Sequence, residues 1–219
     1  MPKLPLRFLL LKAKHLRPGL KARAGVRCRV PDATSVPLTR KDRTMDAMTH
    51  DPANETLCFG YGETMLGLVL VALSGRGVAA ILLGNEPASL RRELAAAYPG
   101  VRLIEDDDRL AGTVAKIVAF IESPGLGLDL PLDMRGSELE LAVWEALRGI
   151  PPGETRTYGA LAKALAVSAT AQEVGAACAA NRLAVAVPCH RVVRADGSIS
   201  GYRWGVQRKR RLLNMEGVA

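Results

Sequence analysis

VAVPCHRVV, residues 185–193, is the stretch of this 219-residue chain that most constrains its architecture and its chemistry. An apolar, strand-like run leads into a proline, after which a thiol, an imidazole and a guanidinium follow in direct succession. Burial raises the pKa of a thiol, whereas a neighbouring base or positive charge favours the nucleophilic thiolate. Cys189 and His190 are therefore candidates for a nucleophile and its base. The alternative is a cysteine packed in the core beside a hydrogen-bonded histidine.

Three short helices are predicted upstream of this stretch. Two capping boxes, each a Ser or Thr followed three residues later by Glu, open helices over 138–149 and 171–180, and a further helix covers 158–165. A short helix, a three-residue turn and a second helix rich in Gly and Ala form a helix-turn-helix candidate. Helical hairpins of such lengths also serve as simple core packing, so the pattern alone leaves both interpretations open.

The part of the chain before these helices, 55–133, predicts a small α/β domain. Short apolar runs separated by Gly-rich turns indicate an antiparallel meander, and Pro or Asp residues open two helices after it. The segment 124–133 is expected to be a return strand or a linker. The carboxylates of this domain are interpreted as a solvated face. The predicted ranges are 57–61, 65–73 and 78–83 for the strands, and 87–98 and 106–121 for the helices.

Charge divides the chain into three blocks of alternating sign. Residues 1–50 carry a net charge of +9, residues 51–145 carry −8, and residues 146–219 carry +7, which gives +8 overall. Such asymmetry indicates a polyanionic partner for one end of the chain, or else reflects chance or genomic composition.

The basic segment 1–48 does not resemble a folded unit. It fits a disordered arm, a targeting peptide, or an extension upstream of a true start at Met45 or Met48, and the last of these is the hypothesis favoured here. Its one apolar run is too short for a secretory signal. No apolar stretch of the chain reaches transmembrane length, so no membrane partner is expected.

The cysteines predict neither a disulfide framework nor a metal site. Their spacing fits a reducing compartment, and a cytoplasmic location is expected. No two of the candidate ligands in the first part of the chain have zinc-finger spacing, so no metal or other cofactor is predicted. These candidates are His15, Cys28, His50 and Cys58.

The hexapeptide 188–193 resembles the signature of the O6-alkylguanine-DNA alkyltransferases, also called methylated-DNA–protein-cysteine methyltransferases. The resemblance covers about residues 55–216 and is greatest to the C-terminal half of the bacterial adaptive-response alkyltransferase. It implies a ribonuclease-H-like α/β domain over 55–133, then a mainly α, winged helix-turn-helix-like domain over 136–219 that binds DNA. The other matching segments are 81–84, 130–136, 178–181 and 196–205.

The resemblance also assigns catalytic roles. Cys189 is implied to accept the alkyl group from guanine O6 by direct displacement, once per molecule, because the thioether formed is stable. His190 is implied to act as base, linked through a water to Glu216 as its orienter. Tyr158 is implied to donate its hydroxyl proton to the guanine ring as negative charge leaves O6.

The implied base pocket and DNA contacts involve more positions. Asn181 would tie the recognition helix to the nucleophile segment, and backbone carbonyls at Cys189 and Val192 would read the guanine amine. Gln172 stands where the family usually has an intercalating Arg, which predicts weaker or more salt-sensitive DNA binding. Tyr202 and Arg203 complete the expected base pocket, and the expected DNA-binding residues are Ala171, Gln172, Gly175, Arg191 and Arg208.

The resemblance thus implies a monomeric, single-turnover DNA repair protein whose partner is double-stranded DNA containing O6-alkylguanine, with O4-alkylthymine as a further substrate to consider. Because the lesion faces into the duplex, the nucleotide must be flipped out. The alternative is a sensor that binds alkylated DNA and recruits other repair factors without reacting. The presence of Cys189 favours repair, and a Cys-His hydrolase lacks an oxyanion-hole signature here.

Overall fold

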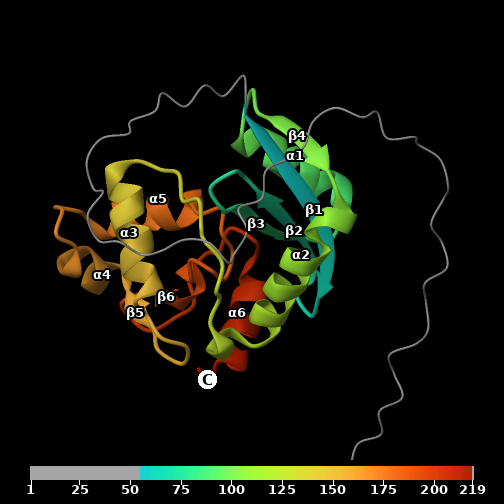
Figure 1. Ribbon diagram of the computed structural model, residues 1–219. Helices are drawn as coiled ribbons and strands as arrows, with labels where there is room; N and C mark the ends of the chain where they lie inside the picture. Colours follow the sequence, from blue (N-terminus) through green and yellow to red (C-terminus); the bar gives the residue numbers. More distant parts are fainter. Residues whose placement is uncertain (1–54, 219) are drawn as a thin grey trace, which may run out of the picture.

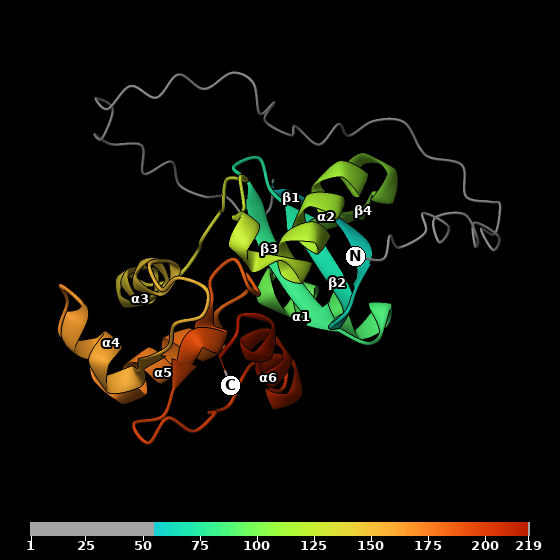
Figure 2. The same cartoon turned by 90° about the horizontal axis from the view of Figure 1, so that it is seen from below.

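The computed structural model of the protein describes residues 55–218, and the predicted leader, 1–48, lies outside them. The chain builds a four-stranded sheet with two helices, followed by a mainly helical half. Figures 1 and 2 show the sheet with α1 and α2 on one side of the molecule, α3–α5 on the other, and α6 between them. The first-half elements are β1 (Thr56–Thr64), β2 (Gly67–Leu73), β3 (Val78–Gly84), α1 (Pro87–Ala97), β4 (Arg102–Glu105) and α2 (Asp107–Glu122).

The sheet has the order β3-β2-β1-β4. The first three strands form the predicted antiparallel meander, whereas β4 pairs in parallel with β1 and was not predicted. β4 has four residues, none of them buried, so it lacks the apolar run by which a strand is recognised. The segment 124–133 forms a 3-10 turn, η2 (Pro124–Leu126), and an irregular linker with a single bridge from Leu132 to Val78.

The second half follows the predicted helices closely. Both capping boxes are present, and the Trp144 indole donates to the Ala177 carbonyl at 2.9 Å, which fixes α3 against α5. None of the helices within residues 55–218 is long and apolar enough to cross a membrane. The second-half elements are α3 (Glu138–Arg148), β5 (Arg156–Thr157), α4 (Tyr158–Ala164), α5 (Ala171–Ala180), η3 (Cys189–Arg191), β6 (Val192–Val193) and α6 (Val206–Met215).

The outer edge of β3 joins the two halves. The Ile81 N–H donates to the Arg182 carbonyl at 2.8 Å, and the Ala184 N–H donates back to the Ile81 carbonyl at 3.0 Å. Farther along the same edge, the Val78 N–H donates to the Pro131 carbonyl at 2.8 Å. An edge strand offers unpaired backbone groups, and here both the linker and the segment that leads to Cys189 use them.

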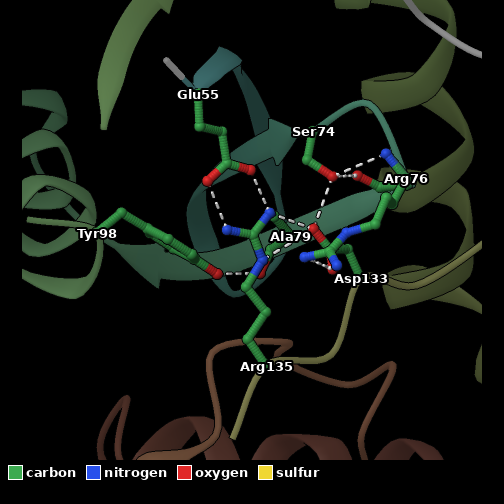
Figure 3. Close-up of polar contacts among 8 residues, drawn as sticks. Glu55, Ser74, Arg76, Ala79, Tyr98, Asp133 and Arg135 are labelled. Atoms are coloured by element: carbon green, nitrogen blue, oxygen red, sulfur yellow. Dashed lines mark hydrogen bonds and ion pairs between the residues drawn. The ribbon is translucent and has the colours of Figure 1, made fainter. Parts of the chain in front are cut away.

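A polar cluster holds the linker against the sheet (Figure 3). The Arg135 guanidinium donates to both carboxylate oxygens of Glu55, at 2.7 and 2.5 Å, and to Asp133, whose carboxylate also accepts from the Ser74 hydroxyl at 2.7 Å. Asp133 is only 6% exposed. The interpretation of the front-domain carboxylates as a solvated face is therefore wrong for Asp133, because a paired carboxylate can be buried where a lone one cannot.

Tyr98 extends this cluster toward the second half. Its hydroxyl donates to the Ala79 carbonyl at 2.6 Å. The guanidinium carbons of Arg135 and Arg182 lie 5.4 and 5.2 Å from the centroid of its ring, within cation–π range. Since Arg182 directly follows Asn181 at the end of α5, the first half helps to position the segment that carries the thiol.

Candidate active site

The backbone before Cys189 is a pair of tight turns, so the predicted strand-like run over 185–187 is wrong. The Ala186 N–H donates to the Ala184 carbonyl at 2.7 Å, around Val185 with a φ of +66°. The Cys189 N–H donates to the Val187 carbonyl at 2.8 Å, which closes a second three-residue turn. Positive φ is strained for a β-branched residue, and such strain clusters at functional sites. The two turns bring Cys189 to the first position of η3.

Asn181 connects the end of α5 to the thiol. Its side-chain oxygen accepts from the Leu183 N–H at 2.8 Å, and its amide donates to the Val187 carbonyl at 2.9 Å and to the Cys189 sulfur at 3.3 Å. Asn181 is 1% exposed. All of its bonds therefore operate in a low-dielectric interior, where they fix geometry strongly.

The two cysteines of the site differ in their surroundings. Burial raises the pKa of Cys189, and the Asn181 amide and the Lys209 cation oppose that shift. Burial raises the pKa of Cys178 to about 12, with no hydrogen bond to oppose it. Cys189 thus rests as a thiol that needs a base, and it is the better placed of the two to ionise.

A buried carboxylate stands behind His190. Glu216 follows the last residue of α6, and its Oε1 lies 2.9 Å from His190 Nε2. The Arg191 guanidinium donates to the same carboxylate at 2.8 and 3.0 Å. Burial alone would raise the pKa of Glu216, but the hydrogen bonds from His190 and Arg191 outweigh it and hold the pKa at about 2.

These bonds set the protonation of His190. Burial lowers the pKa of His190, despite Glu216, so the ring is neutral at pH 7. An ionised carboxylate only accepts, so the ring proton lies on Nε2 and Nδ1 carries the lone pair. Within residues 55–218, Nδ1 is buried without a hydrogen-bond partner. The arrangement therefore presents a free base next to a thiol in the chain.

Two expectations need correction here. The implied water between His190 and Glu216 has no room, because the two side chains are in direct hydrogen-bond contact. Arg191, expected on DNA, is only 5% exposed and also donates to the Ile150 carbonyl at 2.5 Å. Arg191 pairs with the buried carboxylate of Glu216, because an unpaired charge in the interior would destabilise the fold.

A second polar chain lies on the other side of the site and was missed in the sequence. The Lys209 ammonium donates to the Ser200 hydroxyl at 2.7 Å, and that hydroxyl lies 2.6 Å from the Tyr158 hydroxyl. Lys209 is fully buried, and burial lowers its pKa to about 8. A signal was available, because Lys209 lies three and four residues before Leu212 and Leu213, on the apolar face of α6.

Two further groups that were expected to contact DNA are hydrogen-bonded within the protein instead. The Val192 carbonyl accepts from Lys209 at 2.5 Å and from Ser200 at 3.3 Å, so both of its lone pairs are used and it is not free for a guanine amine. Arg208, expected on phosphate, instead donates to the Leu66 carbonyl at 2.7 Å and to the Asn85 side chain at 2.6 Å. It ties α6 to the first half.

A cavity of about 330 Å³ opens beside the thiol. The expected Asn181, His190 and Glu216 do not line the cavity; Asn181 is bonded to the Cys189 sulfur and Glu216 to His190. Ala171 and Gln172 lie exposed at the start of α5. Within residues 55–218, no group of three or more His, Cys, Asp and Glu side chains could hold a metal ion. The cavity is lined by Tyr158, Gly175, Cys178, Ala179, Cys189, Gly201, Tyr202 and Arg203.

Comparison with known sequences gives related proteins over most of the chain. A family model described as the DNA-binding domain of 6-O-methylguanine DNA methyltransferase matches residues 138–218. The bifunctional transcriptional activator/DNA repair enzyme Ada of Escherichia coli is 39% identical, over 94% of this chain and 60% of its own length. The inducible methylated-DNA–protein-cysteine methyltransferase of Bacillus subtilis is 35% identical, over 72% of this chain and 83% of its own. The chain spans only 46% of the Salmonella typhimurium regulatory protein ada.

Solved structures give the same picture. The crystal structure of the Mycobacterium tuberculosis O6-methylguanine methyltransferase has a TM-score of 0.60 at 30% identity, and covers 73% of this chain and 92% of that one. A crystal structure of Mycobacterium tuberculosis OGT in complex with DNA has a TM-score of 0.61 at 30% identity, with the same coverage.

The buried carboxylate predicts a pH dependence of stability. The folded-state pKa of about 2 lies below the ordinary 4.5, so ionised Glu216 stabilises the fold above pH 4.5, and this is lost as the pH falls through about 2. Urea unfolding from pH 7 to 2 should show Glu216→Gln less stable at neutral pH, with its deficit shrinking by up to ~3 kcal/mol on acidification. The exposed Glu122→Gln should track the unmodified protein. A deficit that stays constant with pH would contradict the assignment.

Proposed function

The chain belongs to the family of methylated-DNA–protein-cysteine methyltransferases, and we propose that it transfers a methyl or larger alkyl group from O6-alkylguanine in double-stranded DNA to its own Cys189. The observation that carries this proposal is the cavity that Cys189 and Tyr158 line together. Tyr158 is bonded to the Ser200–Lys209 chain, and Cys189 is followed in the chain by His190, whose neutral imidazole is bonded to Glu216. The cavity is near the lower end of the range for small-molecule sites, as suits a single extruded base.

The reaction begins with activation of the thiol. The Cys189 proton passes to Nδ1 of His190, directly or through a water, and the imidazolium that forms is stabilised by the ionised Glu216. The sulfur then attacks the alkyl carbon in line with the C–O bond. An S–C bond forms, the C–O bond breaks, and its electron pair moves onto guanine O6 and the ring.

The leaving guanine needs a proton, and the chain opposite the thiol supplies one. Tyr158 lines the cavity and can donate its hydroxyl proton to the ring. The Ser200 hydroxyl then turns from the Val192 carbonyl to the Tyr158 oxygen and donates its proton there, and Lys209 gives Ser200 a proton in return. An ammonium with a pKa of about 8 is a suitable donor near neutral pH, because its pKa lies close to the working pH.

The chemistry ends with the thioether. The alkyl group cannot readily leave the Cys189 sulfur, because a C–S thioether offers no good leaving group. Each molecule therefore reacts once. The free thiol must be kept reduced before the reaction, which fits the expected cytoplasmic location.

DNA docking is assigned to α4 and α5, as a winged helix-turn-helix, with the first half ribonuclease-H-like in topology. Ala171, Gln172 and Gly175 are small or neutral, and α5 carries Glu173 but no basic residue. A helix with small side chains can enter the narrow minor groove, where the target nucleotide is flipped into the cavity. Gln172 then fills the position in the base stack that the flipped nucleotide has left.

The acceptor can be identified by mass. Incubation with a duplex bearing O6-methylguanine should add one methyl group to the intact protein, and peptide mapping should locate it on Cys189. Cys189→Ala should abolish the gain, whereas Cys178→Ala is the matched control and should retain it, because Cys178 lines the same cavity without a base or a donor. Tight binding without any mass change would instead support the non-reactive sensor.

The position of Gln172 can be tested through charge. Gln172→Arg adds a cation at the DNA-facing end of α5, so it should tighten binding to duplex DNA. It should also steepen the log–log salt dependence by about one phosphate contact, or ~0.9 in slope, because binding that neutralises fewer phosphates depends less on salt. The expectation that Gln172 makes binding more salt-sensitive is therefore replaced by weaker binding with a shallower slope. Fluorescence anisotropy at several salt concentrations measures both. Ala115→Arg adds the same charge at an exposed position of α2 in the sheet half, so it should change the affinity and the slope much less. Unchanged affinity and unchanged repair rate in Gln172→Arg would show that this position does not meet DNA.

A further inference from the structure

A contact from the sheet half reaches the wall of the cavity. Glu93 lies on α1, and its Oε1 accepts from Nε of Arg203 at 3.0 Å. The same guanidinium donates from Nη1 to the Ala179 carbonyl at 2.8 Å, near the end of α5. Arg203 and Ala179 both line the cavity. One side chain thus bridges the two halves of the molecule at the cavity wall.

Arg203 is the lining residue best able to move. Tyr158, Gly175, Cys178 and Ala179 belong to helices, and their positions are fixed by helix packing. Tyr202 is held in ring contacts with His190 and Trp204, at centroid distances of 6.4 and 5.2 Å. By contrast, the Arg203 side chain is 27% exposed. An exposed guanidinium can swing into solvent once its hydrogen bonds are released.

The loop that carries Arg203 gives it room to move. Gly201 lines the cavity with no atom near the position of a Cβ, and Gly205 has a φ of +98°. Because glycine has no side chain, the backbone at both positions can change conformation at little steric cost. The hydrogen bonds to Glu93 and Ala179 therefore hold this wall closed, and the Glu93 bond is the charge-assisted one of the two.

We propose that Glu93 is a positioning residue that clamps Arg203 across the cavity and thereby sets the largest alkyl group that Cys189 accepts. The inference rests on the proposed function and adds a specificity determinant from the half of the chain in which the sequence indicated no chemistry. A methyl group fits the closed cavity. A benzyl group requires Arg203 to swing outward, which breaks its bond to Glu93 before sulfur and carbon can meet.

The experiment compares two lesions in the full-length protein. Glu93→Gln and Glu93→Ala are reacted with duplexes bearing O6-methylguanine or O6-benzylguanine, and the alkylation rate is followed by intact mass over a range of duplex concentrations. The benzyl rate should rise up to about fivefold, as loss of a partly exposed charge-assisted pair allows, with the methyl rate within about twofold. The gain should lie in the limiting rate at saturation, not in duplex affinity. Glu122→Gln, an exposed carboxylate on α2, should change neither rate.

The outcomes separate the inference from its premise. If methyl and benzyl rates change by the same factor, or neither changes, Glu93 has no role in specificity and the inference is overturned. Arg203→Lys keeps the cation but lacks the fork that bridges two acceptors, so it should raise the ratio of the benzyl rate to the methyl rate, whatever its effect on the methyl rate itself. If the unmodified protein accepts neither group, the proposed function itself fails.

Discussion

The ionised carboxylate of Glu216 is the interaction on which the rest of the site depends. It lies in the interior, 1% exposed, and three hydrogen bonds from His190 and Arg191 compensate the cost of its burial. The same bonds fix the end of α6 against η3 and set the tautomer of His190. The burial of the Glu216 charge thus leaves the lone pair on Nδ1 of His190, the residue that follows the thiol in the sequence.

The sheet half positions this chemistry without taking part in it. The outer edge of β3 pairs with residues 182–184, immediately after Asn181, whose amide reaches the sulfur. Tyr98 contacts Arg182 from the same side, and Arg208 ties α6 to the sheet through Leu66 and Asn85. These contacts act together on the segment between α5 and the thiol, whose strained turn at Val185 needs surroundings that hold it.

Local signals in the sequence predicted much of the fold. The capping boxes at Ser137 and Thr170 predicted both helix starts, because such a box is satisfied by residues three apart and needs no distant partner. β4 was not predictable, because it forms by pairing with β1. The turn at Val185 was not predictable either, because the residues before it are held by the edge of β3.

The site divides in the same way. Cys189 and His190 were candidates from the residues themselves, whereas Tyr158 and Glu216 were named from the resemblance. In the structure Tyr158 and Cys189 line one cavity, and Glu216 is bonded to His190. The partners of charged groups were not foreseen. Arg191 is paired with Glu216 and Lys209 with Ser200, and both pairings are set by burial, which a run of basic letters does not reveal.

The protonation state of His190 is the most direct test of this account. Long-range ¹⁵N–¹H correlation spectra of the ¹⁵N-labelled full chain at pH 7, with His190→Gln used to assign the resonance, report which ring nitrogen carries the proton. A neutral ring with the proton on Nε2 and a bare Nδ1 is expected. A doubly protonated ring, or a proton on Nδ1, would contradict it, because no base would then be left for the thiol.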